Sequence, residues 1–347
     1  MAYPLIILGA GASYDYSPIA KVGPLTKDLV EDHFLLHTLL GKYPGAGDLL
    51  SDILLQVKEK KRGFEEVLTE IKERTKHSEQ MRVHFVALEF YLQALFKEIS
   101  NRGLSPLSEE DFQKARQVNN YKSLVNRINT HTSGKALVAT FNYDSLFEQS
   151  IPHRTFKRMR DYLEGGLKII KLHGSHDWAY IHRKSNIEYG TSPEEIDGFS
   201  WCIKNPDFLE EHRKKDVGLY HQDELKEHSE RNDFIELPAI AIPLLGKDRY
   251  ICHPEHIQRL LIDLPQVDRI LVIGWKAGDQ LLLQNLKKLL PSMGYKLLVV
   301  SSTIESAERI AKHIKDSLEM FPTRIEMRGG GFSGFIADEI SDSFFSE

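Results

Sequence analysis

Cysteine is scarce in this sequence, with only Cys202 and Cys252 in 347 residues. A disulfide framework or a four-cysteine zinc site needs more cysteines, so neither can be built from this chain alone. Hydrophobic runs are also short, and none approaches the roughly 20 residues that cross a bilayer. The first apolar run follows no basic segment and leads straight into glycines, unlike a signal peptide. We therefore expect a cytoplasmic protein that is not inserted in a membrane.

An excess of basic residues is missing as well, since the formal net charge is −5. Proteins that bind duplex nucleic acid directly neutralise its phosphates with Lys and Arg. Direct nucleic-acid binding is therefore not expected. The 41% hydrophobic and 27% charged residues are ordinary for a globular protein, so the chain can form a sizeable core.

Two long segments interrupt the strand-like parts of the sequence. In the first, GFEEVLTEIKER and VHFVALEFYLQALFKEI carry apolar residues at three- and four-residue intervals, which predicts a helical insertion over about 26–133. The second, about 179–236, is polar and too long for an ordinary loop, so we predict another insertion with some helix. Its histidines, His212, His221 and His228, are interpreted as solvated side chains.

Strand-like segments alternate with helices in the rest of the chain. The runs PLIIL, KALVAT, LKIIK, RILVI and YKLLVV have the apolar character of strands covered on both faces. Their alternation with helices predicts an α/β fold with a Rossmann-like, mostly parallel sheet and helices on both faces. We take residues 1–347 as a single domain.

Glycine or polar residues follow these strands, in the segments GAGAS, TFNYD, LHGSHDW, IGWKAGD and VSST. In open α/β sheets the ligand crevice lies outside the carboxyl ends of the strands, so we expect these segments along one rim. Gly9 and Gly11 let backbone amides approach a ligand closely, and in such folds that ligand is usually a phosphate. A tight turn without a ligand is the alternative interpretation.

The glycine turn does not fit other well-known enzyme classes. Tyr14 stands where a dehydrogenase fingerprint has its third glycine, and the next segment is helical rather than a strand ending in an acidic residue. No Walker lysine and no nucleophile elbow occur, so neither an ATPase nor a serine hydrolase is supported. The segment CHPEH at 252–256 has no further cysteine nearby, and no metal site is predicted.

Four motifs occur in a characteristic order: GAGAS at 9–13, TFNYD at 140–144, KLHGSHDW at 171–178 and LVIGWKAGD at 271–279. The ordered set resembles the sirtuin superfamily, and more closely the bacterial sirtuin-like domains that degrade NAD in antiphage defence. In that family the glycine turn cradles the NAD pyrophosphate, the asparagine lies by the nicotinamide ribose, and the histidine is the base. The resemblance assigns catalysis to Asn142 and His173, and cofactor binding to Gly9, Ala10, Gly11, Ser13, Asp144, Gly274 and Ser301.

The chemistry of these side chains agrees with the resemblance. Cleavage of the nicotinamide–ribose bond builds positive charge at the ribose carbon and needs an oriented nucleophile and a base. Asn142 can hold a water or a ribose hydroxyl, and His173 can accept a proton near neutral pH. Alternatives stay open: Asn142 stabilising its own turn, His173 bonded to the backbone, and Asp144 capping a helix. Trp178 and Trp275 line the pocket or belong to the core.

The resemblance implies an NAD hydrolase that takes NAD as its substrate, releases nicotinamide and ADP-ribose, and depletes NAD after infection. It further implies a homo-oligomer and, as in some relatives, a hexameric ATPase of the HerA type as partner. Classical lysine deacylases carry a four-cysteine zinc module, whereas this chain predicts no structural zinc and has its two insertions in that place. A non-catalytic module that binds NAD or ADP-ribose and a protein lysine deacylase remain the alternatives.

Overall fold

The computed structural model describes residues 3–23, 25, 38–60, 62–103, 107–184, 197–214, 218–227, 233–242, 244, 249–291, 294–319, 322–338 and 340–346. The start of the first predicted insertion, His228 and all of residues 185–196 lie outside the described residues.

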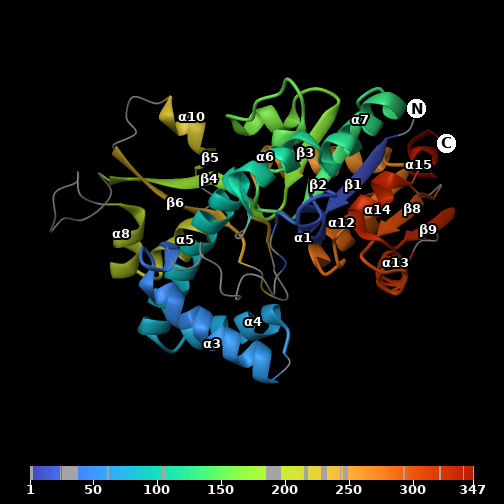
Figure 1. Ribbon diagram of the computed structural model, residues 1–347. Coiled ribbons are helices and arrows are strands. Elements are labelled where there is room, and N and C mark those ends of the chain that lie inside the picture. Colours follow the sequence, from blue (N-terminus) through green and yellow to red (C-terminus); the bar gives the residue numbers. More distant parts are fainter. Residues whose placement is uncertain are drawn as a thin grey trace.

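Six parallel strands form the central sheet, in the order β3-β2-β1-β7-β8-β9 (Figure 1). Every neighbouring pair is parallel and in continuous register, so that Leu8 pairs with both Thr140 and Ile273. Counted along the chain within this sheet, the order is 3-2-1-4-5-6, which defines the doubly wound, Rossmann-like fold. The predicted fold class is therefore confirmed. The strands are β1 (Pro4–Leu8), β2 (Ala136–Thr140), β3 (Leu167–Lys171), β7 (Arg269–Ile273), β8 (Lys296–Val300) and β9 (Arg324–Arg328).

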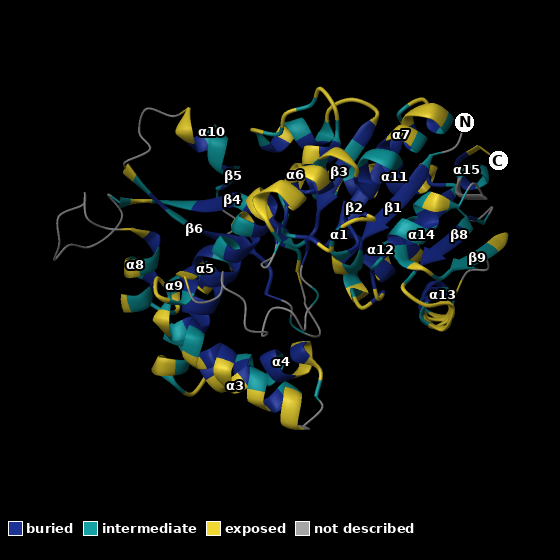
Figure 2. Ribbon diagram, in the orientation of Figure 1, coloured by how far each residue is buried: buried dark blue, intermediate teal, exposed yellow. Residues whose placement is uncertain are grey.

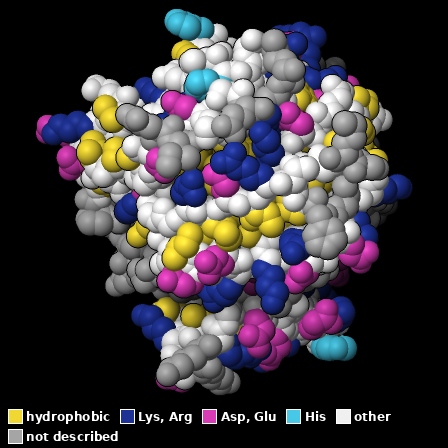
Figure 3. Space-filling model, turned by 90° about the vertical axis from the view of Figure 1, so that its right-hand side faces the viewer, with side chains coloured by type: hydrophobic (Ala, Val, Ile, Leu, Met, Phe, Trp, Pro, Cys, Tyr) yellow, Lys and Arg dark blue, Asp and Glu magenta, His cyan; other side chains and the backbone are white. Residues whose placement is uncertain are grey.

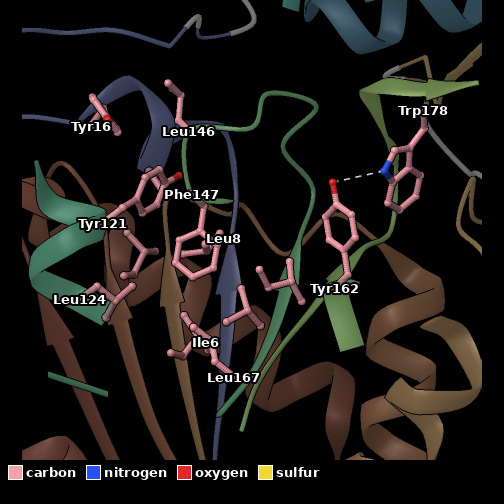
Figure 4. Close-up of a cluster of buried hydrophobic side chains, with 14 of the residues drawn as sticks. Ile6, Leu8, Tyr16, Tyr121, Leu124, Leu146, Phe147, Tyr162, Leu167 and Trp178 are labelled. Carbon is pink, nitrogen blue, oxygen red and sulfur yellow. Dashed lines mark hydrogen bonds between the residues drawn. The ribbon is translucent and has the colours of Figure 1, made fainter. Parts of the chain in front are cut away.

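Each face of this sheet has its own hydrophobic core, because successive side chains of a strand point to opposite faces. Ile6 and Leu8 of β1 join one core, whereas Leu5 and Ile7 join the other. Figure 4 shows Ile6 and Leu8 packed near Tyr121 and other members of the first core. The first core takes side chains from α7 (Asn120–Thr132), α14 (Gly331–Ala337) and α15 (Ile340–Ser346), and the second from α11 (Pro254–Asp263), α12 (Gln280–Leu289) and α13 (Ile304–Leu318).

A helical block lies to one side of the sheet and has a third core of its own (Figure 1). Its apolar side chains come from α3 (Pro44–Lys60), α4 (Phe64–Thr75) and α5 (Glu79–Arg102). Figure 2 shows these helices buried on their inner sides and exposed on their outer sides. Two further helices, α6 (Glu109–Gln117) and then α7, lead the chain back to β2. Ser78, Ser108 and Asn119 cap α5, α6 and α7 respectively.

A second, three-stranded antiparallel sheet with the order β5-β4-β6 was not predicted. Its strand β4 begins at Gly174, inside the KLHGSHDW motif whose Lys171 ends β3, so this motif belongs to two sheets rather than to one strand end. The interpretation of His212 and His221 as solvated is wrong, because both are buried. The elements here are β4 (Gly174–Arg183), α8 (Gly198–Lys204), α9 (Phe208–Lys214), β5 (Leu219–His221), α10 (Gln222–Lys226) and β6 (Phe234–Ile240).

The surface carries charges of both signs. On the face that Figure 3 presents, Lys and Arg lie on both sides of a broken band of hydrophobic side chains, with Asp and Glu near them.

The two chain ends lie close together at one end of the molecule (Figure 1). Across the described ranges, no helix combines the length and the hydrophobicity that crossing a bilayer requires.

Candidate functional site

The predicted rim exists, because all six strands of the central sheet run in the same direction. The motifs that follow β1, β2, β3, β7 and β8 therefore begin at one edge of the sheet. The chain turns outward in opposite directions from β1 and from β7, so the crevice of a doubly wound fold is expected between these two strand ends. Figure 1 shows the short helix α1 (Ala10–Tyr14) at this place.

Three glycines let the loops after β1 and β7 cross at this switch point. A Cβ on Gly9 would lie 2.5 Å from the Gly274 carbonyl oxygen, and one on Gly11 would lie 2.8 Å from the Gly274 Cα. Gly274 itself has a φ of +65°, and a Cβ there would lie 2.4 Å from the backbone nitrogen of Ala12. Close packing of the two loops thus requires glycine at all three positions.

Two backbone N–H groups of the glycine turn already donate hydrogen bonds to the end of β7 and the loop that follows it. The Gly9 N–H donates to the Ile273 carbonyl at 3.0 Å, and the Gly11 N–H donates to the Gly274 carbonyl at 3.2 Å. Ala10 lies between them and is exposed. The tight-turn interpretation therefore accounts for both glycines, and Ala10 is the part of the turn that faces outward.

Ser13, Asn142 and Asp144, which the resemblance groups around the cofactor, meet in one buried hydrogen-bond network. The Asn142 amide donates to Ser13 Oγ at 3.0 Å and to the Tyr121 hydroxyl at 3.3 Å. Ser13 Oγ donates to Asp144 Oδ1 at 3.1 Å and lies 3.0 Å from the Tyr121 hydroxyl. Since the single Ser13 proton goes to Asp144, the Tyr121 hydroxyl is the donor in its contact with Ser13.

This network fixes the orientation of the Asn142 amide. Its NH2 group points toward Ser13 and Tyr121, so amide geometry turns its carbonyl oxygen away from them. Burial raises the pKa of Tyr121 well above its usual value, which keeps the phenol protonated as a donor. Asn142 can therefore present its oxygen to a water or a ribose hydroxyl without losing its own support.

A buried ion pair lies behind the network. Lys171 Nζ, fully buried, donates to Glu148 Oε1 at 2.7 Å and to the Asp144 carbonyl oxygen at 2.6 Å. Burial raises the pKa of the Asp144 carboxyl, and the positive charge of Lys171 opposes this effect. Asp144 Oδ1 also accepts from the Leu146 N–H at 3.1 Å, within the turn that follows β2. The expectation that Asp144 caps a helix is wrong, because the 3₁₀ helix that follows, Glu148–Ser150, has Phe147 at its N-cap position.

His173 lies in a neighbouring cluster of different character. Its ring meets that of Phe141 edge-on, with centroids 4.8 Å apart, and lies nearly parallel to Tyr143 at 6.3 Å. Its Nε2 atom is 3.2 Å from Asp279 Oδ2. Phe141 in turn stacks on Trp275 at 5.2 Å. Residues 141 and 143 thus reach the histidine, whereas Asn142 between them faces Ser13.

Ser301 extends the rim beyond Gly274. Its hydroxyl donates to Ser306 Oγ at 3.0 Å, and its carbonyl oxygen accepts from the Gly331 N–H at 2.9 Å. The Gly274 N–H donates to the Val300 carbonyl at 3.3 Å, so the ends of β7 and β8 are joined directly. The predicted cofactor residues Gly9, Gly11, Ser13, Gly274 and Ser301 therefore come from three strand ends of one rim.

Two residues of this site were not singled out in the sequence. Tyr121 lies in α7, more than a hundred residues from the glycine turn, and its periodic apolar spacing marks it only as core. Asp279 had a local signal, since an aspartate directly before QLLLQ is typical of a helix N-cap. Its contact with His173 depends on how β3 and β7 are placed in the sheet, which no local pattern reveals.

The described residues contain no cluster of three or more His, Cys, Asp or Glu side chains that could hold a metal ion. Cys202 and Cys252 are both free thiols. His256 from the CHPEH segment is buried, and its Nε2 lies 2.7 Å from the Met159 carbonyl oxygen. Trp178 is also a core residue, with its Nε1 donating to Tyr162 at 3.4 Å (Figure 4).

A cavity of about 340 Å³ lies away from the rim, between α4, α5 and α9. Its walls hold charges of both signs, including Lys72 paired with Glu210 at 2.7 Å and Arg82 paired with Asp207 at 3.2 Å. Because these acidic and basic side chains pair with each other, the walls of the cavity favour neither a positively nor a negatively charged ligand.

Comparison with known proteins finds no matching family model and no matching curated protein. Among solved structures, the chain is similar to a Sir2 homologue in complex with NAD (14% identity, covering 99% of this chain and 88% of that one, TM-score 0.41). It is also similar to a structure described under the mechanism and regulation of Sir2 enzymes (13%, 96% and 90%, TM-score 0.38). With TM-scores this low, these similarities do not bear on function, and the fold class rests on the strand order of the sheet.

Proposed function

We propose that this chain binds NAD at the rim between β1 and β7 and hydrolyses it to nicotinamide and ADP-ribose. The observation that carries the proposal is that an oriented amide, Asn142, and a histidine, His173, follow the adjacent parallel strands β2 and β3 at one edge of a doubly wound sheet. The order of the four sequence motifs, which resembles that of sirtuin-like proteins, supports the choice of NAD.

The reaction needs only a water molecule besides NAD. The oxygen of the water forms a bond to the anomeric carbon of the ribose as the bond from that carbon to the nicotinamide nitrogen breaks. The electron pair of the broken bond stays with the nicotinamide, which leaves as a neutral molecule. Asn142 holds the water or a ribose hydroxyl through its carbonyl oxygen, and His173 accepts the proton that the water loses.

The direct test follows nicotinamide release from NAD by chromatography for the wild type, Asn142→Ala and His173→Ala at equal concentration. Loss of the oriented group or of the base is expected to lower the rate about 100-fold or more. Matched controls are Asn129→Ala and His313→Ala, which change the same residue types at exposed positions on α7 and α13. Equal rates in all five proteins would show that Asn142 and His173 are not the catalytic groups.

Two further outcomes separate the alternatives. Calorimetry of the purified chain measures binding of NAD or ADP-ribose. If the chain binds either ligand but turns over no NAD, neither when purified nor in cells under phage infection, it is a signalling module. Nicotinamide release that depends on an acylated peptide and yields acylated ADP-ribose would indicate a lysine deacylase. An NAD hydrolase requires release without any peptide.

We further propose that the activity serves antiphage defence by depleting NAD, in a homo-oligomer regulated by a hexameric ATPase of the HerA type. The resemblance of the sequence motifs to sirtuin-like defence proteins supports this assignment. Cellular NAD after infection is expected to fall with the wild type and to persist with His173→Ala. Light scattering of the purified chain, alone and with the ATPase, tests the assembly.

A further inference from the structure

The two oxygens of the Asp279 carboxylate contact different parts of the structure. Its Oδ1 accepts the Leu282 N–H at 2.9 Å and so caps the N-terminus of α12. Its Oδ2 lies 3.2 Å from Nε2 of His173. Asp279 thereby joins the loop after β7 to the segment that follows β3. In the sheet, β3 and β7 are separated by β2 and β1. A simple helix cap would need only the first contact.

Asp279 acts as a hydrogen-bond acceptor, because its Oδ1 takes the Leu282 N–H. Burial raises the pKa of Tyr250, and the negative charge of Asp279 adds to this effect. A carboxylate can only accept hydrogen bonds, so Nε2 of His173 must be the nitrogen that carries the proton. In a neutral imidazole the other nitrogen, Nδ1, then holds the lone pair.

We propose that Asp279 is a positioning residue for His173. Asp279 selects the His173 tautomer that carries its proton on Nε2, which makes Nδ1 of His173 the proton acceptor of the reaction. The role of Nδ1 as a base rests on the proposed function, whereas the tautomer of His173 follows from its contact with Asp279 alone. The edge-on contact with Phe141 and the nearly parallel ring of Tyr143 limit rotation of the imidazole, and Nε2 faces Asp279 in this orientation. The nearby carboxylate also stabilises the imidazolium that forms when Nδ1 takes the proton.

Asp279→Asn separates capping from positioning. Asparagine is as good an N-cap as aspartate, so α12 keeps its cap through the amide oxygen. The amide NH2 group then faces His173 and donates to Nε2, which forces the proton onto Nδ1 and removes the proposed base. Asp279→Ser keeps a capping hydroxyl but is too short to reach the ring. Asp197→Asn is the matched control, since Asp197 caps α8 through the Ser200 N–H at 3.0 Å.

The first readout is the tautomer of His173, read from long-range proton–nitrogen spectra of the full chain with labelled histidine. The His173 signals are assigned as those absent from His173→Gln. We expect the Nε2-protonated form in the wild type and in Asp197→Asn, and the Nδ1-protonated form in Asp279→Asn. An Nδ1-protonated ring in the wild type, or no change in Asp279→Asn, overturns the proposal.

The second readout is nicotinamide release with thermal unfolding of the same variants. We expect Asp279→Asn to lower kcat about 100-fold with an unchanged unfolding temperature, and Asp197→Asn to change neither. Full activity of Asp279→Asn beside an inactive His173→Ala overturns the positioning role and leaves the hydrolase standing. The expected tautomer change in a chain that never turns over NAD, with or without infection, supports the positioning contact and overturns the proposed function.

Discussion

Two histidines that lie three residues apart, His173 and His176, differ in their partners and their place in the fold. His173 follows β3 at the rim, where its side chain is 13% exposed and meets the Asp279 carboxylate. His176 belongs to β4 of the second sheet, and its Nε2 lies 3.0 Å from Ser145 Oγ in the interior. Burial lowers the pKa of His176 to about 4, so this ring stays neutral at neutral pH. One short motif thus supplies a partly exposed histidine at the rim and a buried histidine in the interior.

The interior around His176 is rich in paired polar groups. Asp177 Oδ2 lies 3.2 Å from Nε2 of His221, whose Nδ1 accepts the Asp223 N–H and caps α10. The pair of Lys171 and Glu148 lies in the same interior, and the Lys171 charge contributes to lowering the pKa of His176. His173 and His176 therefore differ in their partners: a carboxylate at the rim for His173, and a serine hydroxyl in the interior for His176.

The largest effect that tests this comparison is expected from Lys171→Met. The substitution leaves Glu148 buried without its cation, which is expected to lower the free energy of unfolding by about 3–5 kcal/mol. Urea unfolding followed by circular dichroism measures the loss. Lys287→Met is the control, because Lys287 pairs with Glu319 on the surface and should cost about 0–1 kcal/mol. Equal losses in the two variants would contradict the structural role of the interior pair.

The next effect is a dependence of stability on pH. His176 has a folded pKa of about 4 and an unfolded pKa of about 6.5, so the unfolded chain binds more protons between these values. Its contribution is complete above pH 6.5 and is lost progressively as the pH falls toward 4, by on the order of 3 kcal/mol at most. The buried His256, with a pKa lowered to about 4, adds a contribution of the same sign.

Urea unfolding at several pH values between 4 and 7 measures this dependence. His176→Gln should flatten the slope, because glutamine can keep a contact with Ser145 but does not titrate. His313→Gln on the exposed side of α13 should leave the slope unchanged. If His176→Gln retains the full slope, His176 is not held neutral by burial.

The smallest effect is expected from Tyr121→Phe, which tests the hydrogen bonds of the buried network at the rim. The variant loses the hydroxyl that contacts Asn142 and Ser13, at a cost of about 1 kcal/mol in unfolding free energy. Because Ser13 still holds the Asn142 amide, nicotinamide release should fall only modestly, by less than in Asn142→Ala. Tyr295→Phe, which changes a buried tyrosine away from the rim, is the control. A loss of activity as large as that of Asn142→Ala would assign the orientation of the amide to Tyr121 instead of Ser13.

Local patterns in the sequence were sufficient for the central sheet and for much of the rim. Uninterrupted apolar runs such as Leu5–Leu8 identify strands buried on both faces, and their alternation with helices predicts parallel pairing. The second sheet escaped prediction because β5 has only three residues and β4 carries polar side chains whose burial depends on distant partners. A strand of this kind has no distinctive period of its own.

The fold class, the common edge of the motifs and the glycines at that edge could all be read from local patterns, since they follow from periodicity and from the parallel direction of strands. Only the tertiary structure decided that Asn142 faces Ser13 and Tyr121, that Asp279 meets His173, and that His176 is buried. The physical reason is that hydrogen bonds and desolvation depend on distances between groups far apart in the chain. Residues 106 positions apart, such as His173 and Asp279, come into contact only through the order of strands in the sheet.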